Sequence, residues 1–350
     1  MDSQDGFAQL SDHRVYHSCT VCQASAYAMP VAHRDDGSGG DSPRSWSMVG
    51  QLYFSIKIDC ESTQSSVQDA DLGRRASLGF AEVMEGMGGR GSFYCIPSEV
   101  KANVNVYRDL AVRGHQVGLH VHPADLGYEE FLGIYGPNEQ RTILEESTDV
   151  IAQVMGERST GICLGYGSCN DYTRPILVEL GFDHGGTQIP GRILPECASI
   201  AAGAPTEPHY PHRWNRVLAG NLDFVELPVT TDPDSRMWGG KHPQDLRIEL
   251  VDAKNHYYTI HKAVQRQRTA AEPIHAILGC THNIFPYDDS HDFRRETLLG
   301  VIEHTKRIAS EHGLALVPAT EQAIAAAYRA AVPLPAEPAT LELDRRGHGG

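Results

Sequence analysis

The chain alternates between short apolar runs and longer segments in which apolar residues recur every three or four positions. Short runs bounded by Gly, Pro or polar residues are typical of buried strands, and the three-to-four spacing is typical of amphipathic helices. The predicted strands cover residues 51–59, 91–97, 113–123, 160–165, 222–230, 274–282 and 314–318. The predicted helices cover residues 69–87, 104–113, 139–156, 173–180, 246–268, 293–312 and 319–331. This alternation predicts about seven parallel βα units, arranged as a barrel or as a doubly wound sheet.

Three regions fall outside this pattern. Residues 1–50 are weakly periodic and include a polar, glycine-rich stretch at 35–43, so we predict an N-terminal extension with a linker. Residues 183–215 are rich in Gly, Pro and His and read as a long loop that lines a site. We predict one barrel domain over residues 51–332 and a flexible tail over 333–350.

Polar side chains follow several predicted strands where each strand ends. The clearest case is the strand that ends at His120 and His122, because residues two apart on a strand point to the same face. Two imidazoles at this spacing suit a metal ion, although two hydrogen-bonded structural histidines would look the same. The other strand ends carry Asp59, Glu61, Tyr166 and His282. The carboxyl ends of barrel strands meet at one mouth, so this pattern favours a barrel over a doubly wound sheet.

Charge and composition narrow the classes of partner. The net charge of −15 and the pI near 5.6 disfavour nucleic acid and anionic membranes. No apolar run approaches the roughly 20 residues of a membrane span, and the acidic N-terminus does not resemble a signal peptide. We therefore expect a cytoplasmic protein that acts on a small molecule, with a homo-oligomer left open.

Most of the eight scattered cysteines are expected to be reduced core residues. The pair Cys19 and Cys22 is compatible with half a zinc knuckle or a redox pair. A Rossmann-type oxidoreductase is disfavoured, because no GxGxxG motif follows the first strand.

Taken in order, these strand ends resemble the motifs of the polysaccharide deacetylase (NodB-homology) superfamily over residues 52–330. The acidic motif after the first strand is matched by Ile58-Asp59-Cys60-Glu61. The resemblance implies that Asp59 is the general base and Glu61 a metal ligand, with the reverse assignment also open. The second motif is matched by Gly114-His-Gln-Val-Gly-Leu-His120. The family places its second histidine where this chain has Ala124, so His122 is expected to substitute for it.

The third and last motifs are matched further along the chain. Gly165-Tyr-Gly-Ser-Cys-Asn170 leads into Leu180-Gly-Phe182, but Cys163 stands where the family has an arginine that orients the catalytic acid. We expect Arg247 to be a candidate replacement. The last motif is matched by Leu278-Gly-Cys-Thr-His282, which implies that His282 is the general acid.

The resemblance implies a distorted (β/α)7 barrel and a metal-dependent deacetylase that acts on a carbon–nitrogen bond other than a peptide bond. Glu61, His120 and His122 are the expected ligands of one divalent ion, zinc first and cobalt or nickel next. Asp59 and His282 are the expected acid–base pair, and the backbone N–H of Tyr166 is expected to stabilise the oxyanion. An N-acylated amino sugar or a related metabolite is the expected substrate.

Two rival functions remain at this point. The same site could hydrolyse another C–N bond, such as that of a formamide or a cyclic imide. A degenerate barrel could also bind carbohydrate or metal without turnover, which the replacements at Cys163 and Ala124 would fit. Asp59 and His282 speak against pure binding, since binding needs neither a base nor an acid.

Overall fold

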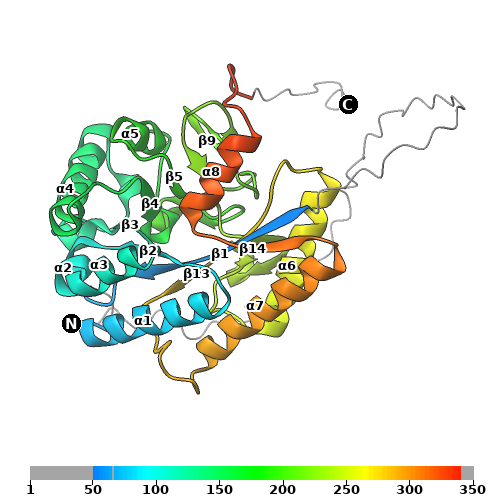
Figure 1. Ribbon diagram of the computed structural model, residues 1–350. Coiled ribbons are helices and arrows are strands. Elements are labelled where there is room, and N and C mark those ends of the chain that lie inside the picture. The colour runs from blue at the N-terminus through cyan, green and yellow to red at the C-terminus, as the bar shows by residue number, and fades with distance from the viewer. Residues whose placement is uncertain (1–49, 65–66, 340–350) are drawn as a thin grey trace, which may run out of the picture. The chain divides into compact units, whose positions relative to one another are not determined.

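The structure is a computed structural model that describes residues 50–64 and 67–339. Most of the predicted N-terminal extension, with Cys19 and Cys22, and the end of the predicted tail lie outside the described residues. Figure 1 shows a central sheet with helices packed around it. No helix in the described part is long and apolar enough to cross a membrane.

The central sheet has eight strands, and all their pairings are parallel. Seven of them follow the order β10-β5-β4-β3-β2-β1-β13, and β14 also pairs with β1. The strands are β1 (Gln51–Cys60), β2 (Ser92–Cys95), β3 (Gln116–Val121), β4 (Gly161–Leu164), β5 (His184–Gly186), β10 (Val225–Glu226), β13 (His275–His282) and β14 (Ala315–Pro318). Beyond β10, the N–H of Thr230 donates to the carbonyl of Leu278 on β13 at 2.8 Å. This contact draws the two edges together, and the sheet forms the distorted barrel expected from the sequence.

The helices surround this sheet (Figure 1). They are α1 (Ala70–Gly86), α2 (Pro97–Ala102), α3 (Val104–Val112), α4 (Pro137–Met155), α5 (Thr173–Glu179), α6 (Ala253–Thr269), α7 (Phe293–Glu311) and α8 (Glu321–Ala331). On β1, Phe54, Ile56 and Ile58 belong to the main apolar core. The intervening Lys57 and Asp59 point to the opposite face, into the barrel, because side chains alternate along a strand.

The largest differences from the predicted elements lie between residues 183 and 252. The predicted loop contains β5, whose three residues are too few for an apolar pattern. Gly185 on β5 has a φ of 151°, and a Cβ there would lie 1.8 Å from the carbonyl oxygen of Ile162. Only glycine fits this position, so the sequence looks like a loop where the sheet continues.

The predicted strand over 222–230 is reduced to β10. It is followed by a hairpin that the sequence pattern did not predict, β11 (Thr231–Met237) and β12 (His242–Asp245). The helix predicted from residue 246 begins only at Ala253, because residues 246–248 run beside β13 and exchange backbone hydrogen bonds with Cys280. The predicted loop region also contains the short pair β6 (Ile193–Leu194) with β7 (Ser199–Ile200). A second short pair, β8 (Pro211–His212) with β9 (Asn215–Ala219), begins inside this region and ends just after it.

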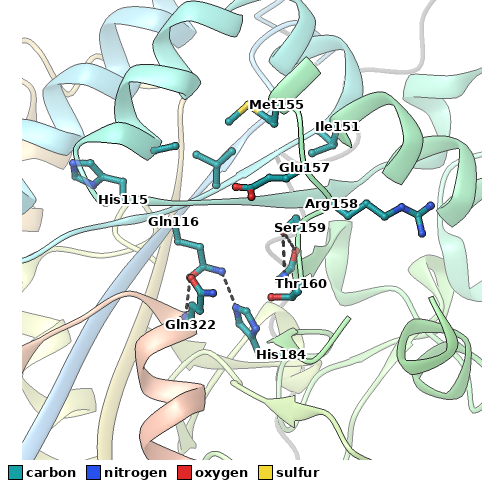
Figure 2. A pocket seen from close by; sticks show the side chains of 13 residues that line it. His115, Gln116, Ile151, Met155, Glu157, Arg158, Ser159, Thr160, His184 and Gln322 are labelled. Carbon is teal, nitrogen blue, oxygen red and sulfur yellow. Dashed lines mark hydrogen bonds between the residues drawn. The ribbon is translucent and has the colours of Figure 1, made fainter. Parts of the chain in front are cut away.

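A cavity of about 320 Å³ opens at the amino-terminal ends of β3, β4 and β5 (Figure 2). Its wall includes Gln116, Gly161 and His184, which are the first residues of those strands. The polar strand ends singled out in the sequence lie at the carboxyl ends of the strands. The cavity and the candidate site therefore belong to opposite ends of the barrel.

Candidate functional site

Glu61, His120 and His122 meet at the carboxyl ends of β1 and β3. The Oε2 atom of Glu61 lies 2.9 Å from Nε2 of His122 and 3.4 Å from Nε2 of His120. The two Nε2 atoms are 3.0 Å apart. Donor atoms of all three residues lie within 4.8 Å of one another. Two imidazoles and a carboxylate that point their donor atoms at one place are a suitable ligand set for a divalent ion such as zinc.

The far sides of both imidazoles are also held. Nδ1 of His120 lies 3.2 Å from the carbonyl oxygen of Cys163, and Nδ1 of His122 lies 3.3 Å from Oε1 of Glu130. Such partners leave Nε2 as the nitrogen that is free to bind a metal. A Cβ on Gly165 would lie 2.5 Å from Nε2 of His122, so this imidazole packs directly on the glycine. The described residues thus fit a divalent ion in their donor set and in the partners behind it.

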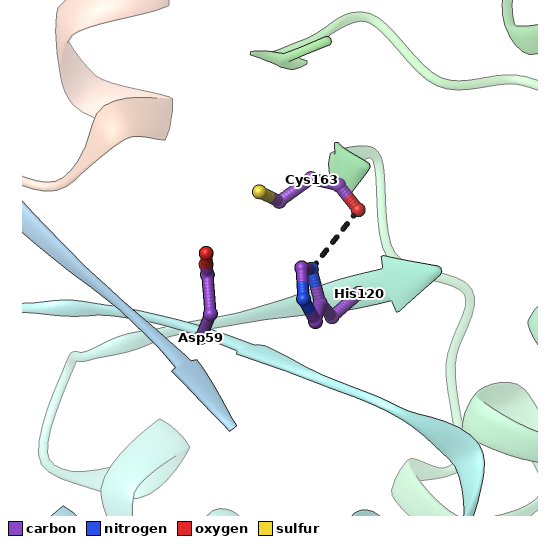
Figure 3. Close-up of side chains that lie close together, drawn as sticks. All are labelled: Asp59, His120 and Cys163. Carbon is purple, nitrogen blue, oxygen red and sulfur yellow. Dashed lines mark hydrogen bonds between the residues drawn. The ribbon is translucent and has the colours of Figure 1, made fainter. Parts of the chain in front are cut away.

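Asp59 lies beside this cluster and is nearly fully buried. Its side chain faces those of His120 and Cys163, which come from two other strands (Figure 3). Its Oδ1 atom has no hydrogen-bond partner among the described residues. Burial raises the pKa of Asp59, but Lys57, His120 and His282 together hold that pKa below its usual value. Asp59 is therefore ionised and has an oxygen ready to accept a proton.

Lys57 occupies the barrel interior two residues before Asp59. Its Nζ donates to Sγ of Cys163 at 2.7 Å, and its side chain is almost fully buried. Arg247, the candidate replacement for the missing arginine, instead pairs with Asp245 at 3.4 Å. The cation whose charge lowers the pKa of Asp59 in the structure is thus a lysine from the same strand.

His282 ends β13 and is held by an acid that the sequence did not single out. Nδ1 of His282 lies 2.6 Å from Oε1 of Glu249. Burial lowers the pKa of His282, but Glu249 raises it more, to about 9. At neutral pH His282 therefore carries a proton on both nitrogens, and Nε2 can give one up. β1 and β13 pair with Asp59 opposite His282, so the two residues flank the barrel mouth together.

The turn that carries Glu61 is held by hydrogen bonds to Asn283, the residue that follows β13. Oδ1 of Asn283 accepts hydrogen bonds from the backbone N–H groups of Glu61 at 2.8 Å and Ser62 at 3.1 Å. The buried Glu99 accepts from Ser62 Oγ, from the N–H of Thr63 and from Asn283. The Glu61 carboxylate therefore stands on a turn in which the N–H groups of Glu61, Ser62 and Thr63 are all hydrogen-bonded.

Tyr166 lies on the rim of the site in a left-handed conformation, with φ 58° and ψ 3°. Its ring is half-exposed and contacts the ring of His122, with centroids 5.4 Å apart, and that of Phe131, with centroids 5.1 Å apart. Phe131 is also left-handed, with φ 76°. Strained non-glycine residues of this kind gather at functional sites.

All six residues singled out in the sequence lie at this mouth, and their catalytic and ligand roles stay predictions. The structure adds Glu130, Glu249 and Asn283, which contact them, and Lys57, whose charge lowers the pKa of Asp59. Asn283 directly follows His282 and could have been suspected from that position. Glu130 lies in a segment without a periodic pattern and Glu249 in one predicted to be helical, and nothing in the sequence marks either residue. Trp214 is exposed, and Trp238 stacks on His242 with ring centroids 4.4 Å apart.

A family model described as polysaccharide deacetylase matches residues 75–185, a segment that includes His120, His122 and Tyr166. No curated protein matches the chain by sequence. The matched segment does not include Asp59, Glu61 or His282. Only the fold brings these three residues next to it.

Several solved structures share the fold. One, described as a polysaccharide deacetylase from Mycobacterium smegmatis, aligns with a TM-score of 0.56 and 16% identity, covering 86% of this chain and 98% of that one. A structure named Puue allantoinase aligns with a TM-score of 0.56 and 14% identity, covering 84% and 96%. A structure described as a probable polysaccharide deacetylase from Pseudomonas aeruginosa PAO1 aligns with a TM-score of 0.55 and 13% identity, covering 82% and 94%. The family match over residues 75–185 and the fold shared with these structures both support the polysaccharide deacetylase (NodB-homology) superfamily expected from the sequence.

Proposed function

We propose that the protein is a metal-dependent amidohydrolase that removes an acyl group, most simply acetyl, from an N-acylated amino sugar or a related small metabolite. The observation that carries this proposal is the convergence of Glu61, His120 and His122 beside a buried carboxylate, Asp59, that has an unpartnered oxygen. The family whose model matches residues 75–185 is named for deacetylation, which supports the same reaction class.

In this proposal Glu61, His120 and His122 hold one divalent ion, zinc first and cobalt or nickel as alternatives. When bound, such an ion lowers the pKa of water towards neutrality and polarises a carbonyl oxygen. Glu61 is the better ligand candidate of the two acids, because its carboxylate lies within 3.4 Å of both imidazoles. The carboxylate of Asp59 lies close to the donor atoms of only one of these imidazoles, that of His120.

The remaining steps are assigned to the side chains around the cluster. Oδ1 of Asp59 accepts the proton of the attacking water. The N–H of Tyr166 donates a hydrogen bond to the oxygen on which negative charge develops. Nε2 of His282 then gives its proton to the departing nitrogen, and Glu249 stabilises the charged imidazole before that transfer. An amide needs this acid, because an unprotonated amide nitrogen is a very poor leaving group.

A second candidate is the hydrolysis of another C–N bond, such as that of a formamide or a cyclic imide. A similarly folded structure is named an allantoinase, which supports keeping this candidate. The same base, ligands and acid would serve both reactions. A barrel that only binds its ligand has less support, since the paired His282 and Glu249 have no evident use in binding alone.

The test is the metal content of the purified protein together with a screen for acyl release. We expect about one divalent ion per chain, lost in His120→Ala and kept in His275→Ala, a variant of a histidine at the opposite end of β13. Acetate release from N-acetylated amino sugars, compared with ring opening of cyclic imides, then separates the two candidate reactions. A protein that stays metal-free after incubation with zinc, cobalt and nickel would contradict both.

A further inference from the structure

Arg192 is a buried cation without an anionic partner. It is only 2% exposed. Its Nε donates to Nδ1 of His242 at 3.1 Å, and its Nη1 donates to the carbonyl oxygen of Tyr166 at 2.8 Å. No carboxylate of the described residues lies within 4.0 Å of the guanidinium, and Nη2 makes no hydrogen bond to any of them. Several N–H groups of this charged side chain thus have no hydrogen-bond acceptor among the described residues.

The nearest charged neighbours do not neutralise this guanidinium. The buried Asp245 is shared between Nη2 of Arg247, at 3.4 Å, and Nε2 of His242, at 3.3 Å. Burial lowers the pKa of His242, so this imidazole is neutral at pH 7. Arg192 and Arg247 contribute two positive charges and Asp245 contributes one negative charge. The cluster therefore has an excess of one positive charge.

This cluster borders the candidate site. The carbonyl that accepts from Arg192 belongs to Tyr166, whose ring contacts His122. On the other side, His242 is covered by the half-exposed ring of Trp238. Tyr166 thus joins the guanidinium, through its backbone carbonyl, to His122, one of the proposed metal ligands, through its ring.

Burying a charge without a partner is unfavourable, and proteins rarely keep such a charge unless a ligand compensates it. A guanidinium presents its N–H groups as a planar fork that matches the oxygens of a phosphate or carboxylate. We propose that Arg192 binds an anionic group of the substrate, a phosphate or a carboxylate. This inference rests on the proposed function for its substrate, and it narrows that substrate to acylated metabolites that carry a negative charge.

A purely structural role for Arg192 is the alternative. In that case its hydrogen bond to Tyr166 would hold the left-handed turn, and the side chain would have no preference for anions. The two roles differ in binding: a structural arginine affects charged and neutral ligands alike, whereas a recognition arginine affects the charged ligand alone.

The test is calorimetric binding of inorganic phosphate, N-acetylglucosamine 6-phosphate and N-acetylglucosamine to the full-length metal-loaded protein. We expect the wild type to bind both phosphates, and Arg192→Gln to weaken both at least tenfold while leaving the neutral sugar unchanged. Arg307→Gln, which removes an exposed arginine of α7, serves as the matched control and should change nothing. His122→Ala should keep phosphate binding, which separates the guanidinium from the metal as the anion site.

The proposal is overturned if phosphate does not bind the wild type, if Arg192→Gln binds it equally well, or if only His122→Ala loses it. Should Arg192→Gln fail to fold, Arg192→Lys is the second variant, because it keeps the positive charge but lacks the planar N–H groups of the guanidinium. We expect it to bind phosphate at least threefold more weakly than the wild type. Unchanged affinity would overturn the proposal. Binding needs no turnover. A protein that binds phosphate through Arg192 but releases no acyl group would retain this inference and lose the proposed function.

Discussion

Both ends of the barrel carry buried polar side chains, but the hydrogen bonding of these side chains differs between the two ends. At the amino-terminal end, Gln116 donates to His184 at 2.8 Å and to Tyr94 at 3.1 Å. Its carbonyl oxygen accepts from Ser92 Oγ. It also accepts from the N–H of Gln322 (Figure 2). At the carboxyl end, Asp59 keeps an unpartnered oxygen, and the donor atoms of His120 and His122 face each other.

Hydrogen-bond satisfaction, more than polarity or the presence of a cavity, thus separates the Gln116 network from the end that holds the proposed site. In the Gln116 network the donors and acceptors are already hydrogen-bonded to one another, so few of them remain free to bind a ligand. Unused acceptors and converging imidazoles cost stability and are kept where chemistry requires them. This agrees with the general placement of barrel active sites at the carboxyl ends of strands.

The change with the largest expected effect removes the proposed base. Asp59→Asn keeps the shape of the side chain but cannot accept the proton, so we expect kcat to fall by about 10²–10⁴-fold. Metal content should remain near that of the wild type, since Glu61 is the proposed ligand. The measurement is steady-state kinetics with elemental analysis. If Asp59→Asn lost the metal ion and Glu61→Gln kept it, Asp59 would be the metal ligand and Glu61 the base.

The next change disturbs the position of a ligand. In Gly165→Ala the new Cβ would lie 2.5 Å from Nε2 of His122 and would push the imidazole aside. A displacement on the order of 1 Å costs about 100-fold in rate, so we expect a loss of that order in kcat/KM and weaker metal binding. Gly86→Ala is the matched control, because no atom lies within 4 Å of its new Cβ. Equal activity of both variants would contradict the packing of His122 on Gly165.

A smaller effect is expected from the partner of the proposed acid. His282 has a pKa of about 9 and must be protonated to donate, so kcat/KM should decline as the pH rises through that value. In Glu249→Gln the anion is lost, the pKa of His282 falls, and the decline should begin at lower pH. A pH–rate profile of both proteins measures this shift. An unmoved alkaline limb would show that His282 is not the titrating acid.

The smallest effect on activity is expected at the opposite end. Gln116→Leu leaves the partners of a buried amide unsatisfied, which should lower the free energy of unfolding by about 1–3 kcal/mol. We expect kcat to remain unchanged, since the network does not reach the ligand side chains. Denaturant unfolding measures the change in stability, and steady-state kinetics on the same preparation measure kcat. A large fall in kcat at unchanged stability would remove the distinction between the two ends.

Much of the site was predictable because its signals are local. The spacing of His120 and His122 and the alternation along β1 and β13 place side chains on a known face, whatever surrounds them. The contacts made by Glu130 and Glu249 depend on irregular segments, and Glu249 reaches His282 across 33 positions of sequence. The short β5 was missed for a related reason, since its glycines carry no apolar pattern.

The sequence by itself therefore determined most of the strands and helices, the strand ends that carry polar side chains and the family resemblance of their motifs. Only the tertiary structure decided that Lys57, in place of Arg247, lowers the pKa of Asp59, that Glu249 holds His282, and that Arg192 is buried without an anion. Strand and helix patterns arise from neighbours along the chain, whereas the partner of a buried charge is set by which loops the closed barrel brings together.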